Sequence, residues 1–202
     1  MKKILLLFLL TLPVVLNAQK AKNDTKYLAG AVTTRDGYVC FEKTYQVPGT
    51  SKAELFRLLK QYTQKVIVEG ENHLEQARIT EDNPEDGIIA ASIEEYLYFK
   101  RKAWTMHRVR FYYQLVYQIE DGKFSITMRR LHYLYDDINA GDYAAENWIT
   151  DSEALSKDGT KLTRIAGKFR RFTIDRKDEI FKGAARAAGA IKKVNKVIEV
   201  EE

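Results

Sequence analysis

Apolar and polar residues alternate along several stretches of the chain, which is typical of strands that bury one face against a core. Lys43 and Glu95 are charged exceptions on the apolar faces of the stretches Tyr38–Val47 and Ile88–Phe99. Gln76–Thr80 is predicted as a short strand at the edge. The alternating stretches are Tyr38–Val47, Ile88–Phe99, Val109–Glu120 and Phe124–Met128. Together they predict an antiparallel sheet with one buried face.

The last two stretches are joined by Asp121-Gly122, a sequence typical of a two-residue hairpin loop. A loop of that length pairs Glu120 with Lys123, and apolar residues then face apolar residues as the strands leave the turn. Basic residues from Lys100 to Ala103 predict another turn, between the two longest stretches. The sequence therefore predicts three consecutive antiparallel strands.

Helices are predicted on either side of these strands. Pro48-Gly49 ends the first strand, and Ser51 with Glu54 forms a capping box that opens a helix. The apolar face of that helix contains Leu55, Leu59, Tyr62 and Val66. A final helix is predicted from Thr173. Its buried stripe is Phe181, Ala184, Ala188 and Ile191, and Gly183 and Gly189 are expected to weaken it.

The order of strand, helix, several antiparallel strands and helix predicts one α+β domain, with the helices on one face of the sheet. We place this domain at residues 37–190. Residues 1–18 are predicted as a signal peptide, 19–36 as a linker and 191–202 as a fraying tail.

The N-terminus has the layout of a secretory signal. Lys2 and Lys3 precede an apolar run over residues 4–16, which is too short to span a bilayer. We expect cleavage between Ala18 and Gln19, and a location in the periplasm, at the outer membrane or outside the cell. The alternative is a buried N-terminal helix. No later apolar stretch predicts a transmembrane helix.

Charge is distributed unevenly along the chain, whose formal net charge is +5. Nine acidic residues and one arginine lie from Glu69 to Glu95, whereas twelve Lys or Arg and three acidic residues lie from Lys161 to Lys196. One interpretation is two solvated surfaces of opposite sign. The other is a basic surface that contacts anionic headgroups or polysaccharide, through an anionic-surface patch of Arg170, Arg171, Lys182 and Arg186. Nucleic acid is not an expected partner of an exported protein.

Several blocks of sequence occur in a familiar order. They are Val39–Lys43, Val47–Gly49, Ser51–Leu55, Gly87–Ile89, Asp121–Lys123, Trp148–Asp151, Gly167–Arg171 and Thr173–Asp175. This series resembles a family of exported domains of unknown function that is typical of Bacteroidetes envelopes. The resemblance implies a fold like that of the TATA-box-binding protein (TBP) and an envelope location. It implies no catalytic residues, and a likeness in fold to a DNA-binding protein does not imply DNA binding.

The sequence contains no recognisable motif of a catalytic or metal site. His73, His107 and His132 lack the spacing of metal ligands, and there is no nucleophile elbow, phosphate-binding glycine loop or Cys-x-x-Cys. The one cysteine, Cys40, has no partner for an intramolecular disulfide and no histidine nearby in sequence. No cofactor and no metal are therefore predicted.

Four polar residues form a candidate ligand site. If the hairpin register continues unchanged, Arg130 and His132 lie on the apolar face of the sheet together with Lys43 and Glu95. Such a group within an apolar lining suits a small anionic ligand.

The alternative is a β-bulge at Arg129-Arg130. The bulge turns Leu131 and Tyr133 inward and places both arginine charges in water. Lys43 then extends to solvent or pairs with a buried Glu95.

Two functions remain open. The favoured one is an exported envelope module that binds a small amphiphile, a glycan or another envelope protein, with no evident catalysis. The alternative is a carboxylate-dependent hydrolase of envelope substrates that uses Glu94 or Glu95, although no second carboxylate has a recognisable spacing. A filled core with a paired Glu95 argues against the hydrolase, and an open cavity with two carboxylates argues for it. The tyrosines of the strands are interpreted as packing residues rather than as a sugar platform.

Overall fold

The computed structural model describes residues 25–102, 105–134 and 141–191. The predicted signal peptide and the tail from residue 192 lie outside these ranges. The strands are β1 (Thr34–Arg35), β2 (Tyr38–Gln46), β3 (Arg78–Asn83), β4 (Ile88–Lys102), β5 (Thr105–Glu120), β6 (Lys123–Leu134) and β7 (Asp142–Ala144). The helices are η1 (Thr25–Tyr27), α2 (Lys52–Tyr62), η2 (Thr63–Val68), η3 (Ala145–Asn147), α3 (Asp151–Ala154) and α4 (Ala166–Ala187).

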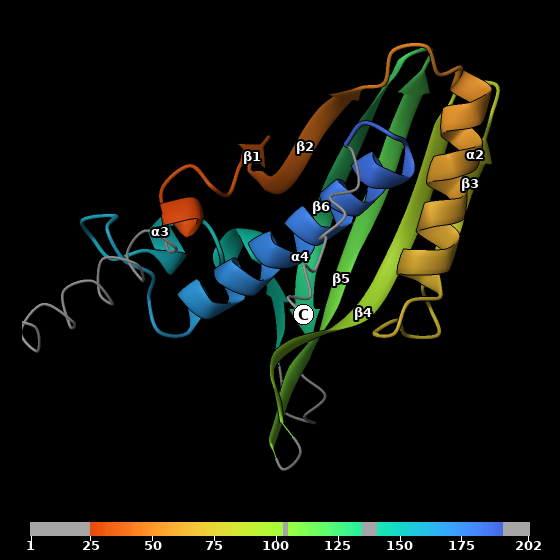
Figure 1. The fold of residues 1–202 in the computed structure, drawn as a ribbon. Helices are drawn as coiled ribbons and strands as arrows, with labels where there is room; N and C mark the ends of the chain where they lie inside the picture. The colour runs from red at the N-terminus through yellow and green to blue at the C-terminus, as the bar shows by residue number, and fades with distance from the viewer. Residues whose placement is uncertain (1–24, 103–104, 135–140, 192–202) are drawn as a thin grey trace, which may run out of the picture.

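The strands form one antiparallel sheet in the order β1-β2-β6-β5-β4-β3, with β7 paired to β6. Both long helices, α2 and α4, lie on the same face of this sheet (Figure 1). We call that face the inner face and the opposite one the outer face. The predicted α+β architecture is therefore confirmed.

The core lies between the inner face and the two long helices. Alternate strand residues such as Val39, Ile89, Phe111 and Ile126 are fully buried there, as the alternation of the sequence predicts. Leu55 and Leu59 of α2, with Phe169, Ile174 and Ile180 of α4, complete this core.

The predicted hairpin turn is present and also holds the start of α2. The Ser51 hydroxyl accepts a hydrogen bond from the Glu54 amide at 3.3 Å, as in a capping box. The Asp121 carboxylate accepts from the Lys52 amide at 2.7 Å. Gly122 has a φ of +73°, which favours glycine, and its carbonyl accepts from the Val47 amide at 2.7 Å.

The helices differ from the predictions at three points. After Tyr62 the chain winds into the π-helix η2, so Ile67 and Val68 are buried and Val66 is exposed. The helix α4 begins at Ala166 rather than Thr173. It ends at Ala187, which leaves Ile191 exposed instead of buried.

Gly183 has a packing role that the sequence does not reveal. A Cβ at this position would lie 2.2 Å from the Tyr62 hydroxyl oxygen. That hydroxyl donates a hydrogen bond to the Ile180 carbonyl at 3.1 Å. The glycine therefore lets α2 and α4 approach closely, which offsets its cost in helix propensity.

The strand ends also differ from the predictions. The expected basic turn at Lys100–Ala103 is wrong, because β4 continues to Lys102 and pairs with β5 as far as Lys102 and Thr105, with a register shift between Tyr98 and Lys100. The edge strand β3 is Arg78–Asn83 rather than Gln76–Thr80. Its mostly exposed residues and the register shift after Ile79 explain why the alternation there is weak.

The segment expected to be a linker belongs to the fold from residue 25 onward. Tyr27 and Val32 are buried, and β1 pairs with β2 through a turn at Asp36-Gly37. Asp36 has a φ of 52° and Gly37 a φ of 82°, as in the type I′ turn that Asp-Gly favours. Asp36-Gly37 is therefore a second hairpin signal in the sequence, of the same kind as Asp121-Gly122.

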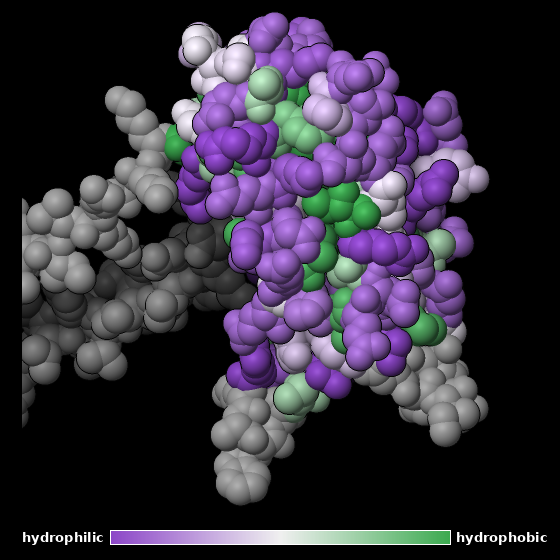
Figure 2. Space-filling model, turned by 90° about the vertical axis from the view of Figure 1, so that its right-hand side faces the viewer, coloured by the Kyte–Doolittle hydropathy of each residue, from purple (hydrophilic) through white to green (hydrophobic). Residues whose placement is uncertain are grey.

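Figure 2 shows the side of the molecule that carries α2. Hydrophilic residues predominate on it, and hydrophobic residues occupy small separate areas. None of the helices within the described ranges combines the length and the hydrophobicity of a membrane-spanning segment.

Candidate functional site

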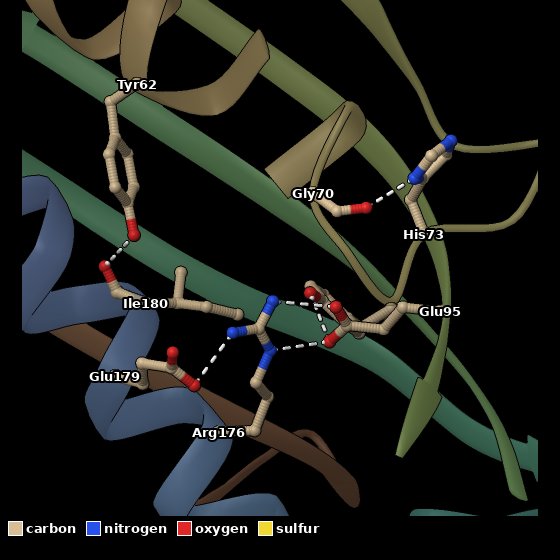
Figure 3. A network of polar contacts seen from close by, with 8 residues as sticks. Tyr62, Gly70, His73, Glu95, Arg176, Glu179 and Ile180 are labelled. Carbon is tan, nitrogen blue, oxygen red and sulfur yellow. Dashed lines mark hydrogen bonds and ion pairs between the residues drawn. The ribbon is translucent and has the colours of Figure 1, made fainter. Parts of the chain in front are cut away.

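A network of polar contacts surrounds Glu95 on the inner face (Figure 3). The Glu95 carboxylate is 1% exposed and accepts from Arg176 Nε at 2.8 Å, from Arg176 Nη2 at 2.7 Å and from the Tyr113 hydroxyl at 2.9 Å. Burial lowers the pKa of Arg176, but the hydrogen bonds to Glu95 and the charge of its carboxylate, with smaller contributions from Tyr113 and Glu179, together raise the pKa above its ordinary value. Glu95 is thus paired with Arg176 of α4, and not with Lys43, in a filled core.

The four predicted ligand residues are not brought together. Gln114 pairs with Arg129, whereas Tyr112 pairs with His132, so the register shifts by one residue at Arg130. The alternative of a β-bulge is therefore confirmed. It places Arg130 and His132 on the outer face, with Leu131 and Tyr133 buried as expected. Lys43 is exposed, and its ammonium lies 5.0 Å from the centre of the Tyr45 ring.

Glu94 and Glu95, the carboxylates considered for the hydrolase alternative, do not form a pair with each other. Glu94 and Glu95 are consecutive in β4 and therefore point to opposite faces. On the outer face, Glu94 accepts from the Tyr112 hydroxyl at 2.8 Å and from Arg110 Nη1 at 3.4 Å. The two carboxylates cannot act together on one substrate.

The predicted anionic-surface patch also needs correction, because Arg170 is fully buried. Its guanidinium donates to the carbonyls of Tyr27, Leu28 and Ile149 at 2.6, 2.7 and 2.9 Å. It also pairs with Asp151 at 2.7 Å. These bonds join residues 27–28 to α4. Of the other three residues, Arg171 is half-buried and lies 4.6 Å from the Tyr27 ring centre, while Lys182 and Arg186 are exposed.

The most distinctive polar site lies on the outer face, where the β1–β2 turn meets the bulge in β6. A recess of about 510 Å³ opens there. We call it the arginine recess. It is lined by Arg35, Asp36, Tyr38, Val39, Cys40, Arg129 and Arg130.

The bulge brings two consecutive arginines into this one recess. In a regular strand Arg129 and Arg130 would point to opposite faces. Here Arg130 adopts a φ of 57°, and both side chains are exposed and line the arginine recess. A left-handed conformation costs a residue other than glycine about 1–2 kcal/mol. Stability alone would therefore favour glycine at position 130.

Among the described residues, Arg130 also has fewer hydrogen-bond and ion-pair partners than the other two arginines of the recess. Arg129 Nε donates to the Gln114 side-chain oxygen at 2.9 Å, and Arg35 pairs with Glu42. No hydrogen bond or ion pair joins the Arg130 guanidinium to any part of the chain that the structure describes. Asp36 is the one carboxylate in the lining. The arginine recess thus presents guanidinium groups that suit an oxyanion.

Cys40 and Tyr38 complete the lining of the arginine recess. Burial raises the pKa of the Cys40 thiol, which lowers the fraction of reactive thiolate. Tyr38 stands at the rim with 68% of its surface exposed. Across residues 25–102, 105–134 and 141–191, no three His, Cys, Asp or Glu side chains are arranged to hold a metal ion.

Other aromatic rings of the outer face are already covered by neighbours. The rings of Tyr112 and His132 stack with centres 4.4 Å apart and 3° between their planes. The Arg108 guanidinium lies 3.6 Å from the Tyr96 ring centre, and that of Arg101 lies 4.9 Å from the Tyr98 ring centre. Tyr38 therefore differs from these tyrosines in its exposure.

Comparison with known proteins identifies the family. A model of a domain of unknown function (DUF4468) with TBP-like fold matches residues 41–134. A DUF4468 family protein from Bacteroides ovatus, known from its crystal structure, is 34% identical with a TM-score of 0.76, over 83% of this chain and 96% of that one. The chain belongs to the DUF4468 family.

A more distant structural neighbour supports the fold. A TBP-like protein from Parabacteroides distasonis is 22% identical with a TM-score of 0.63, over 78% of this chain and 97% of that one. The resemblance noted in the sequence and the TBP-like fold are therefore confirmed. No curated protein matches the sequence.

Proposed function

We propose that this DUF4468 protein is an exported binding module of the bacterial envelope, which holds a negatively charged ligand in the arginine recess. The observation that carries the proposal is Arg130. Its guanidinium has no partner in the described part of the chain, and its backbone is held in a conformation that stability disfavours. Strained residues of this kind cluster at functional sites, and bulges reorient side chains there.

Two further observations support the proposal. The apolar run and small residues at the N-terminus have the layout of an export signal. The inner face is filled by Glu95, Arg176 and Tyr113, so the exposed polar groups of the outer face are the ones open to a ligand. An anionic amphiphile, an acidic glycan or an acidic segment of another envelope protein would each carry the required charge.

The export part is tested by sequencing the N-terminus of the protein from an envelope fraction. We expect the mature chain to begin at Gln19. An intact Met1 in that fraction would refute the predicted signal.

The binding part is tested by mass spectrometry of small molecules that co-purify with the mature protein. Arg130→Gly removes the unpartnered cation and relieves the strained backbone. Lys182→Gln removes one exposed charge from α4, on the opposite face of the sheet, and is the matched control. We expect an anionic compound on the wild type and on Lys182→Gln that is lost from Arg130→Gly. The same compounds at equal amounts on all three proteins would contradict a site in the arginine recess.

A further inference from the structure

We infer that the arginine recess recognises an acidic sugar unit, so that the ligand is an acidic glycan. This inference rests on the proposed function and names the ligand class of that same site. It combines three features of the outer face: the donors of the bulge, the exposed ring of Tyr38, and the side chains that lead away from the arginine recess.

The donors suit an oxyanion such as a carboxylate or sulfate group. The Nε of Arg129 donates to Gln114, so the two Nη groups of Arg129 remain available. The Arg130 guanidinium adds five N–H donors. Arg35 contributes less, because it pairs with Glu42. Planar guanidinium groups bind oxyanions through paired, charge-assisted hydrogen bonds.

The Tyr38 ring supplies the second element of sugar recognition. It is a large aromatic side chain at the rim of the arginine recess, and 68% of its surface is exposed. The C–H groups on one face of a sugar ring pack on such an aromatic face, while the hydroxyl end of Tyr38 remains in water. A sugar ring on Tyr38 places its acidic substituent toward the arginines.

The surface beyond the arginine recess favours a hydroxyl-rich chain. From Cys40 and Arg129 toward the Asp121-Gly122 turn, the outer positions of β2, β6 and β5 carry hydroxyl, amide and charged groups. Thr44 and Ser125 are paired by a hydrogen bond of 2.7 Å between their hydroxyl oxygens. The outer-face residues of this strip are Glu42, Thr44, Gln46, Lys123, Ser125, Thr127, Gln114, Val116 and Gln118.

The outer face argues against two other anionic ligands, single-stranded nucleic acid and an anionic lipid. Single-stranded nucleic acid is usually bound by stacking successive bases on several exposed aromatic rings. Here the rings of Tyr96, Tyr98 and Tyr112 are covered by Arg108, Arg101 and His132. An acyl chain needs apolar walls, and Val116 is the one large apolar side chain in the strip.

The experiment measures binding of defined probes to the mature protein by isothermal titration calorimetry. The acidic probes are tri-galacturonate and a sulfated trisaccharide, and the neutral control is maltotriose. A single-stranded oligothymidylate and vesicles that contain phosphatidylglycerol represent the other anions. We expect at least one acidic trisaccharide to bind at least tenfold more tightly than maltotriose, and more tightly than the oligonucleotide or the vesicles.

Two variants of the arginine recess and one control variant assign the binding to it. Arg130→Gly is expected to lower the affinity for the acidic trisaccharide at least tenfold. Lys182→Gln is expected to leave that affinity within twofold of the wild type. Tyr38→Ala is expected to lower the affinity for the trisaccharide but not the affinity for inorganic phosphate, because only the sugar packs on the tyrosine ring. Thermal unfolding of each variant verifies that it is folded.

Several results would overturn the inference. These are equal binding of acidic and neutral trisaccharides, tighter binding of the oligonucleotide or vesicles, or an unchanged affinity in Arg130→Gly. If an anion that is not a sugar co-purifies with the wild type and is lost from Arg130→Gly, the acidic glycan is excluded while the proposed function stands. If nothing that binds depends on Arg130, both fail.

Discussion

Replacing Arg176 by Met tests how strongly the buried Glu95 depends on α4. The substitution removes hydrogen bonds of 2.8 and 2.7 Å from a carboxylate that is 1% exposed, and it leaves the Tyr113 hydroxyl as the remaining donor. Removing one partner of a buried ion pair costs about 3–5 kcal/mol. The Arg176 side chain is 15% exposed and also contacts Glu179, so some water reaches the site. We therefore expect a loss near the lower end, about 3 kcal/mol.

The assay is urea unfolding of the mature protein, followed by circular dichroism, with thermal unfolding in parallel. A loss of this size corresponds to a Tm lower by about 6–12 °C for a chain of this length. The double variant Glu95→Leu with Arg176→Met removes both charges, and apolar replacements of buried pairs are often neutral. We expect the double variant to be more stable than Arg176→Met by about 2 kcal/mol.

The matched control is Arg57→Met on α2, whose pair with Glu54 is exposed. Its cost should stay below about 1 kcal/mol. An Arg176→Met protein within about 1 kcal/mol of the wild type, or a double variant less stable than either single variant, would refute the reasoning. In that event the Glu95 carboxylate would not need the guanidinium of α4.

Three further substitutions test the turn, the helix contact and the bulge. Gly122→Val is expected to lower stability by about 1–2 kcal/mol, because φ is +73° there, and unchanged thermal unfolding would argue against that turn. Tyr62→Phe loses the bond to Ile180 and is expected to be about 1 kcal/mol less stable at pH 7. Burial raises the pKa of Tyr62 to about 12. The protonated hydroxyl stabilises the wild type fully below the unfolded pKa of about 10, and this stabilisation is lost as pH rises toward 12. By about pH 11, the free energy of unfolding of Tyr62→Phe should therefore match or exceed that of the wild type. A Tyr62→Phe protein that is still less stable than the wild type at about pH 11 would contradict the raised pKa of Tyr62. Arg130→Gly is expected to raise stability by about 1 kcal/mol, measured by urea unfolding, and a loss would mean that the left-handed backbone is not strained.

Much of the fold follows from local signals in the sequence. The alternation that predicts β2, β4 and β5 depends on neighbouring residues, and so do the capping box at Ser51 and the hairpin at Asp121-Gly122. The first turns of α4 carry no comparable signal. Their most buried polar residue, Arg170, is held by carbonyls of Tyr27, Leu28 and Ile149, which are distant in sequence.

The bulge and the arginine recess were harder to predict for the same reason. Alternation in β6 allows two registers, and only the burial of Leu131 and Tyr133 in the assembled core decides between them. The arginine recess combines residues 35–40 with Arg129 and Arg130, which the pairing of β2 with β6 brings together. The Asp36-Gly37 turn is the local signal that would have located one of its walls.

The most direct test of the arginine recess as the ligand site is a backbone-amide NMR titration of the mature protein with tri-galacturonate. We predict that the saturating shifts fall on residues 35–42 and 127–132, with Gln114 beside them, and that these shifts vanish in Arg130→Gly. Shifts confined to α2 and α4, or no shifts with either tri-galacturonate or the sulfated trisaccharide at millimolar concentration, would contradict the account.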